Sequence, residues 1–195
     1  MAERPDDPQV TAWALAAGRG DEQALAAFVR ATQRDVHRFV AHLSGRADAE
    51  DLAQETYLRA LRALPRFAGR SSARTWLLSI ARHTAADAVR TAQRRPRTTG
   101  DVDWDTVAVR AGRVRSNLDD AVLLRELVAA LPPDRREAFV LTQLLDLSYA
   151  DAALVCGCPI GTIRSRVARA REDLVDALET RGTGEQDDAH HHPAG

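Results

Sequence analysis

Apolar residues recur at spacings of three and four along most of this 195-residue chain, and no other feature constrains its fold as strongly. The longest stripe follows Asp21 and consists of Leu25, Phe28, Val29, Val36, Phe39, Val40 and Leu43. Alanine is the commonest residue and aromatic residues make up only 5% of the chain, and both biases favour helix over sheet. We therefore predict an all-α protein.

Start and stop signals divide this periodic sequence into two groups of helices. We predict helices over residues 7–18, 21–43, 47–64, 75–93, 118–131, 134–146, 150–156 and 160–179. Residues 94–117 contain a proline and two glycines and lack a sustained period. The sequence thus predicts two small helical domains, 1–93 and 118–180, joined by a flexible linker over 94–117. The last segment, 181–195, has almost no apolar content and is predicted to be a disordered tail.

The composition argues against membrane-bound and exported proteins. No apolar run approaches the roughly 18 residues that a membrane span requires. The N-terminal sequence MAERPDDP is acidic and contains prolines, whereas a secretory signal would be basic and then apolar. The two cysteines, Cys156 and Cys158, are too close in sequence to join distant segments by a disulfide. We expect a cytoplasmic protein that does not associate with membranes.

The formal net charge of −1 hides a strong segregation of charge along the chain. Residues 66–97 contain eight arginines and a single acidic residue, Asp87. Residues 164–171 contain four arginines and no acidic residue. Solvated helix faces would explain one such block, whereas two blocks in separate predicted domains favour a nucleic-acid partner.

The sharpest local pattern is LSYADAALVCGCPIGTIRSRVARAREDL, residues 147–174. Ala153 falls where two helices must approach closely, Gly157 suits a left-handed turn, and Ile163 returns an apolar residue to the shared core. This spacing is typical of a helix-turn-helix, whose second helix enters the major groove of DNA. The predicted DNA contacts on that helix are Thr162, Arg164, Ser165, Arg166, Ala168, Arg169 and Arg171. The alternative is a basic surface helix in a domain that serves packing alone.

Three segments in this order resemble the extracytoplasmic-function (ECF) sigma factors of bacterial RNA polymerase, and among them the SigC-like group of actinobacteria. They are AEDLAQETYLRAL at 49–61, FAGRSSARTWLLSIARHTAADAVR at 67–90, and LPPDRREAFVLTQLLDLSYADAA at 131–153, which leads into the helix-turn-helix. The resemblance covers nearly the whole chain. Three motifs separated by a suitable linker are far more specific than a helix-turn-helix alone.

The resemblance implies a protein that performs no chemistry of its own and needs no cofactor. Its expected partners are core RNA polymerase, through the β′ clamp helices and the β flap, and promoter DNA, with an anti-sigma factor as a regulator. Polar residues at helical neighbour spacings after position 47 can share one face, which would receive an arginine-rich coiled coil. The residues expected to bind core polymerase are Asp48, Asp51, Leu52, Gln54, Glu55 and Leu58.

The resemblance also assigns the segment from Phe67 to Arg90 to recognition and opening of the minus-ten element. A base in single-stranded DNA is read after it has been turned out into a pocket, and a loop rich in glycine, serine and arginine suits that task. The residues expected to contribute are Gly69, Arg70, Ser71, Ser72, Ala73 and Arg74 of the loop, and His83, Asp87 and Arg90 of the following helix.

Two other classes of function fit the sequence less well. A stand-alone helix-turn-helix regulator would bind a palindromic duplex as a dimer, but this leaves the first domain unexplained. An enzyme would need a catalytic constellation, and the chain contains no HExxH, no GxSxG and no glycine-rich phosphate loop. We therefore predict no catalytic residue and no metal site.

Overall fold

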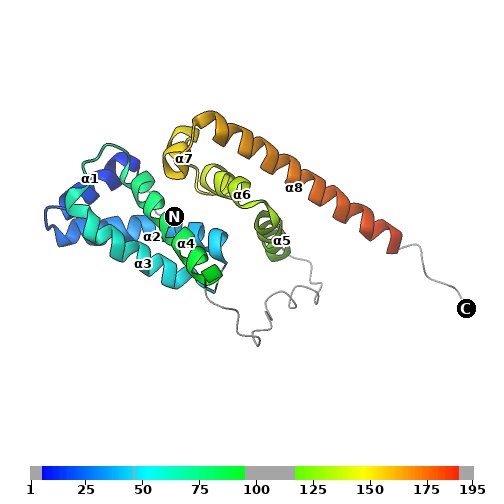
Figure 1. Ribbon diagram of the computed structural model, residues 1–195, viewed down its shortest axis with the longest axis horizontal. Helices are drawn as coiled ribbons and strands as arrows, with labels where there is room; N and C mark the ends of the chain where they lie inside the picture. Colours follow the sequence, from blue (N-terminus) through cyan, green and yellow to red (C-terminus); the bar gives the residue numbers. More distant parts are fainter. Residues whose placement is uncertain (1–5, 46, 95–116, 189–195) are drawn as a thin grey trace, which may run out of the picture.

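A computed structural model describes residues 6–45, 47–94 and 117–188. Within these residues the chain is helical and contains no strand, which confirms the predicted all-α fold (Figure 1). The α-helices are α1 (Asp7–Ala17), α2 (Glu22–Ser44), α3 (Ala49–Ala63), α4 (Ala73–Arg94), α5 (Asn117–Ala130), α6 (Pro133–Phe139), α7 (Tyr149–Cys156) and α8 (Ile160–Asp188). Two shorter elements are η1 (Leu64–Arg66) and η4 (Val140–Leu144). The predicted linker lies outside the described residues except at its two ends.

Helices α1 to α4 pack together as an N-terminal domain. The Asp21 side chain caps α2 by accepting a hydrogen bond from the backbone N–H of Ala24 at 2.9 Å. The predicted stripe of α2 is largely confirmed, because Phe28, Val36 and Phe39 are at most 1% exposed. These side chains belong to the same core as Leu77 of α4, so the third and fourth helices close over the second.

Helices α5 to α8 form a C-terminal domain that contains the predicted helix-turn-helix. Gly157 ends α7 in the left-handed conformation at φ +63°, which a residue with a side chain rarely adopts. Ser148 caps the start of α7 by accepting from the backbone N–H of Asp151 at 3.0 Å. On α8, Ile163 and Val167 are at most 1% exposed, as the sequence predicted.

The prediction of one continuous helix over residues 134–146 is wrong in its second half. This segment consists of α6 followed by the π-helical turn η4, in which the backbone N–H of Leu145 donates to the carbonyl of Val140 at 2.9 Å. A π-turn takes up one extra residue, which turns Leu145 and Leu147 back toward the core. Periodicity alone did not reveal this turn because every residue from Phe139 to Leu141 is also buried.

The predicted disordered tail, residues 181–195, also needs a correction at its start. Helix α8 continues to Asp188, whereas residues 189–195 lie outside the described part of the chain. Low apolar content removes the reason for such a segment to pack. It does not stop an existing helix from growing, since each added residue gains a backbone hydrogen bond without a new nucleation cost.

The two domains touch each other. Helix α4 packs against α7, and α2 packs against α6. The helix-turn-helix therefore contacts the N-terminal bundle, while α8 extends away from it (Figure 1). Among the residues that the structure describes, none of the helices combines the length and apolar content needed to cross a membrane.

Ile163 tests the helix-turn-helix core because its side chain is fully buried. Ile163→Ala should lower the free energy of unfolding by about 2–5 kcal/mol, since it removes buried methyl groups and leaves a cavity. Urea denaturation followed by circular dichroism measures this loss. Leu154→Ala is the matched control, because Leu154 is 61% exposed and its removal should change stability by less than about 0.5 kcal/mol. Equal losses in both variants would contradict the assigned packing.

Candidate nucleic-acid and polymerase interfaces

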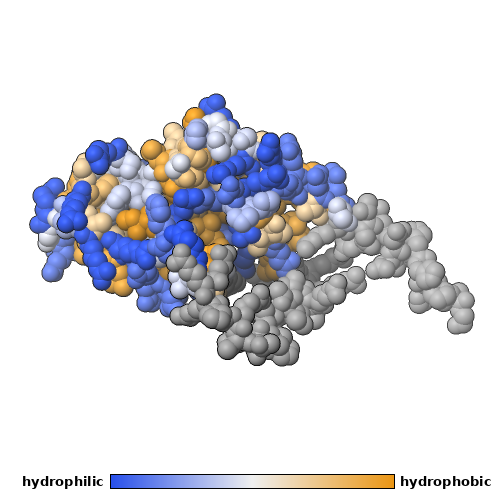
Figure 2. All heavy atoms as spheres, viewed as in Figure 1, coloured by the Kyte–Doolittle hydropathy of each residue, from blue (hydrophilic) through white to orange (hydrophobic). Residues whose placement is uncertain are grey.

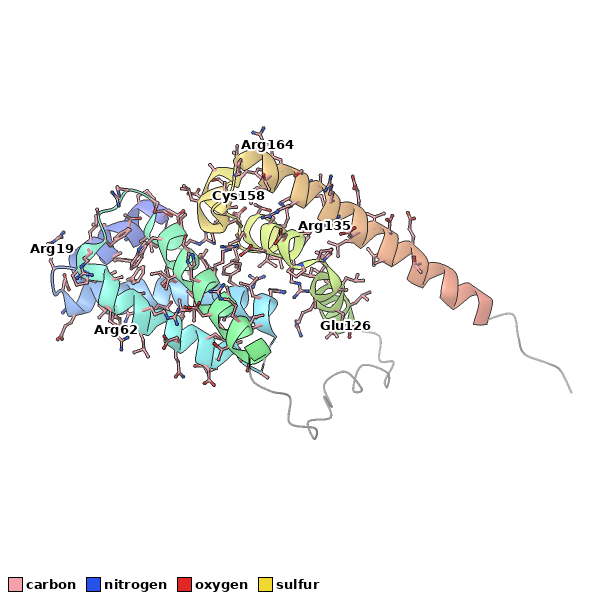
Figure 3. The ribbon with its side chains drawn as sticks, in the orientation of Figure 1. Arg19, Arg62, Glu126, Arg135, Cys158 and Arg164 are labelled. Atoms are coloured by element: carbon pink, nitrogen blue, oxygen red, sulfur yellow. The ribbon has the colours of Figure 1, made fainter. Side chains whose placement is uncertain are left out.

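The first candidate surface is the outer face of α8. Arg164, Ser165, Ala168, Arg169 and Arg171 are exposed there, and hydrophilic side chains gather along this helix (Figure 2). Arg164 projects from the first turn, away from the other helices (Figure 3). Within the described residues neither Arg164 nor Arg169 forms an ion pair, so both guanidinium groups are available to a ligand.

Two other arginines of α8 are held by the domain itself. Arg166 is half-buried and donates from Nη2 to Asp134 Oδ2 at 2.5 Å, which ties α8 to α6. Arg171 donates from Nη2 to Gln143 Oε1 at 2.7 Å. The structure therefore separates the predicted contacts into arginines free for an outside partner and arginines that brace the recognition helix.

The second candidate surface is the loop before α4. Gly69 adopts a left-handed conformation at φ +66°, and its α-carbon faces the side chain of Leu15 in α1. Ser72 caps α4 by accepting from the backbone N–H of Thr75 at 3.1 Å. The backbone N–H of Ala73 donates to Thr11 Oγ1 at 3.0 Å, so the loop is fixed on α1. Arg70 remains exposed at the loop tip, with Ser71 half-buried beside it.

Arg74 lies inside the protein. It is 8% exposed, and its Nε donates to Asp35 Oδ2 of α2 at 2.7 Å. Its Nη2 donates to the backbone carbonyl of Leu145, which belongs to the C-terminal domain. Arg74 was predicted to belong to the loop, but it lies in the first turn of α4 and links the two domains.

Further along α4, the predicted helix residues share a charged network with α3. Asp87 accepts from Arg59 Nη1 at 2.7 Å and from Arg90 Nη2 at 2.5 Å. These two hydrogen bonds lower the pKa of Asp87, which keeps its carboxylate charged. Arg59 also donates to Glu55 at 2.8 Å, so the predicted DNA-binding and polymerase-binding faces meet through this arginine. His83 is exposed and its Nδ1 lies 2.7 Å from the carbonyl oxygen of Ser79.

The third candidate surface is the face of α3. Asp48, Asp51, Gln54 and Leu58 are exposed and Glu55 is half-buried, whereas Leu52 is only 8% exposed. The predicted set therefore consists of one core residue and five residues that a partner can reach. Asp48 stands at the N-cap position of α3 but makes no capping hydrogen bond there.

An open groove of about 750 Å³ runs between α3 and α2. Its lining joins the exposed apolar side chains Leu58 and Leu61 to polar residues of both helices, among them Gln33, Arg34 and Glu50. Tyr57 lines the groove and shares a 2.8 Å hydrogen bond with Thr32 of α2, while burial raises the pKa of Tyr57 to about 12. The contribution of α2 was missed from the sequence because its outer residues showed no charge pattern of their own.

Polar side chains take part in the contact between the domains. Arg82 of α4 donates from Nε to Glu137 Oε1 of α6 at 2.5 Å, and the Glu137 side chain is only 8% exposed. Thr75 Oγ1 donates to Asp151 Oδ1 of α7 at 3.1 Å. Helix α4 therefore carries the predicted minus-ten surface and also bonds to the second domain through Arg74, Thr75 and Arg82.

The cysteines and metal ligands add no further site. Cys156 is buried, and burial raises the pKa of its thiol well above the ordinary range, which makes it a packing residue. Among the residues that the structure describes, histidine, cysteine and acidic side chains form no group suited to holding a metal ion.

Comparison with known proteins identifies the family. The model of sigma-70 region 2 matches residues 28–95, and the model of sigma-70 region 4 matches residues 121–174. The ECF RNA polymerase sigma factor SigC of Mycobacterium tuberculosis is 56% identical over 174 residues, which cover 89% of this chain and 94% of that protein. The chain belongs to the ECF sigma factors.

Other proteins resemble this ECF sigma factor over most of its length. The sigma-E factor of Escherichia coli is 36% identical, and the match covers 83% of this chain and 90% of that protein. The sigma factor RpoE of Bartonella quintana, solved with the anti-sigma factor NepR, superimposes with a TM-score of 0.64 at 30% identity and covers 80% of this chain and 96% of that one. CnrH, solved with the cytosolic domain of CnrY, shares the fold at a TM-score of 0.68 and 22% identity, covering 90% and 99% of the two chains.

The Arg82–Glu137 pair tests the contact between the domains of this sigma factor. Arg82→Ala should lower the free energy of unfolding by about 2–4 kcal/mol, because Glu137 is left buried without a partner. Adding Glu137→Gln to that variant should recover part of the loss, since the unpaired charge is then removed. A double-mutant cycle in urea denaturation measures the coupling. Purely additive losses would contradict a direct interaction.

Proposed function

We propose that this sigma factor binds core RNA polymerase through α3, reads the minus-thirty-five element with α8, and opens DNA at the minus-ten element with the loop before α4. The observation that carries the proposal is the pair of unpaired guanidinium groups, Arg164 and Arg169, on the exposed face of the recognition helix. Arginine bonds guanine O6 and N7 in the major groove in bidentate fashion. The domains we assign to these tasks are residues 118–180 for duplex reading and residues 1–93 for polymerase binding and melting.

Polymerase binding is assigned to the α3 face and the adjoining groove. Asp51, Gln54 and Glu55 offer acceptors to an arginine-rich coiled coil such as the β′ clamp helices. Leu58 and Leu61, which are 50% and 41% exposed, supply apolar area that such a helix pair would cover. The β flap would contact the C-terminal domain, and a polymerase partner implies that the protein works in the cytoplasm.

Minus-ten recognition is assigned to Arg70, Ser71 and Ser72 of the loop, with His83, Asp87 and Arg90 on the helix behind it. Asp87 and Arg90 already hydrogen-bond each other, so a displaced strand would meet a fixed network. Arg74 can approach DNA only after its bond to the Leu145 carbonyl has broken. We infer that the two domains separate when the polymerase and the promoter are engaged.

An anti-sigma factor is proposed as a further partner. The supporting observation is that RpoE of Bartonella quintana, at 30% identity, was solved in complex with an anti-sigma factor. A catalytic activity and a cofactor are not part of the proposed function, because sigma factors act by directing the polymerase. The family assignment does not favour the alternative of a stand-alone helix-turn-helix regulator.

The α3 assignment predicts a loss of polymerase binding without a loss of folding. Asp51→Arg, and separately the double variant Gln54→Ala with Glu55→Ala, should weaken assembly by a few kcal/mol, since each charge-assisted bond contributes about 1.5–3 kcal/mol. Binding to purified core polymerase, measured by fluorescence anisotropy, gives the change. Glu172→Ala, an exposed acidic residue of α8, is the control and should bind normally. Unchanged affinity in both α3 variants would reject this face.

The two DNA-reading surfaces predict different defects. Arg164→Ala and Arg169→Ala should weaken duplex binding at the minus-thirty-five element by about 1–3 kcal/mol. Arg70→Ala in the loop and His83→Ala on α4 alter exposed side chains and should impair opening while leaving duplex binding intact. A duplex binding assay and a permanganate footprint of the holoenzyme separate the two. The same profile in both sets of variants would contradict the division.

A further inference from the structure

A second cavity, of about 350 Å³, lies where the two domains meet. Helix α2 supplies one wall, and α5 with η4 supplies the other. We call it the interdomain cavity, and its lining residues are His37, Arg38, Ala41, His42, Leu124, Arg125, Val128 and Leu144. It therefore exists only while the domains are in contact.

The polar lining of the interdomain cavity has one sign of charge. His37, Arg38, His42 and Arg125 provide every ionisable side chain of the lining, and no carboxylate is among them. Burial lowers the pKa of His42, and the neighbouring guanidinium groups of Arg38, Arg125 and Arg136 lower it further. Three positive charges, from α2, α5 and α6, thus converge on one histidine.

These arginines differ from the others at the domain contact. Arg74 and Arg82 each meet a carboxylate, whereas Arg38 and Arg125 form no ion pair with any described residue. Arg136 donates from Nη1 to the His42 carbonyl at 3.4 Å and from Nη2 to the Leu131 carbonyl at 2.9 Å. Its Nε is buried and meets no acceptor in the part of the chain that the structure describes. Positive charges crowded together in this way repel one another and oppose the contact between the domains.

We propose that the interdomain cavity binds a small condensed phosphate, that is, a polyphosphate chain or the polyphosphate group of a nucleotide. Guanidinium groups bind phosphate in bidentate fashion, and converging arginines suit a compact ligand with several negative charges. A volume of about 350 Å³ lies within the range of small-molecule sites. A nucleic-acid strand carries one charge per nucleotide and fits the charge density of this cavity less well.

Such a ligand would hold the two domains together, because its contacts come from both. A ligand that binds only the closed arrangement shifts the equilibrium about 100-fold toward it when present at 100 times its dissociation constant. The polyphosphate would then oppose release of Arg74 and delay promoter opening. This regulatory consequence rests on the proposed function, whereas the binding itself does not.

Calorimetric titration of the full chain with tripolyphosphate tests the proposal. We expect one site, with at least a tenfold loss of affinity in Arg38→Ala and also in Arg125→Ala, because each removes a charge from one wall. Arg125→Lys should retain part of the affinity. Arg62→Ala, which alters an exposed arginine of α3 outside the cavity, is the matched control and should bind like the parent chain (Figure 3).

Three results would overturn the proposal. The first is a tripolyphosphate affinity that is unchanged in both cavity variants, or that falls as strongly in Arg164→Ala, since binding would then be spread over the basic surface. The second is a single-stranded oligonucleotide that displaces tripolyphosphate and depends on Arg38 and Arg125, which would assign the site to nucleic acid. The third is equal affinity for orthophosphate and tripolyphosphate, because orthophosphate should bind at least tenfold more weakly to a polyphosphate site. Normal assembly of Arg125→Ala with core polymerase would keep the proposed function independent of the outcome, because Arg125 lies outside the groove between α2 and α3 whereas Arg38 lines both the groove and the cavity.

Discussion

The buried pair between Arg74 and Asp35 is the interaction on which the arrangement of this sigma factor depends. A guanidinium group away from water must be matched in charge and in hydrogen bonds, and Arg74 meets this need with Asp35 of α2 and the Leu145 carbonyl of the second domain. The first turn of α4 is consequently fixed to α2 and to the turn that precedes α7. Any motion that exposes this turn to DNA must supply a new partner for Arg74.

Arginine is the only basic residue type in this chain apart from histidine. The role of each arginine depends on the partner that its guanidinium group meets. Where a carboxylate is near, as for Arg82 with Glu137 and Arg135 with Asp173, the guanidinium joins two helices. Where a guanidinium forms no ion pair with a described residue, as for Arg164 and Arg169 on α8, it is available to an external anion. The rigid, bidentate guanidinium of arginine suits both the joining of helices and the binding of an external anion, whereas the flexible ammonium group of lysine would suit them less well.

The sequence predicted the helical class, most helix boundaries and the helix-turn-helix, because these follow from local periodicity and from single residues such as Gly157. It placed the α3 and α8 surfaces through motifs that lie within one helix. It did not predict that Arg74 is buried, since its partners Asp35 and Leu145 lie 39 and 71 residues away. The π-turn at η4 was missed for a related reason, because continuous burial on both sides hides a change of helical period.

In the arrangement proposed above, the domains are held together in the free protein and separate on a promoter. Pulsed electron paramagnetic resonance measures the distance between the domains, with spin labels at the exposed positions 19 and 172 in a chain whose two cysteines are replaced by serine. Domains in contact should give one narrow distance distribution for the free protein, and their separation should give a different one in the complex with core polymerase and promoter DNA. The same distribution in both states, or a broad distribution in the free protein, would contradict this arrangement.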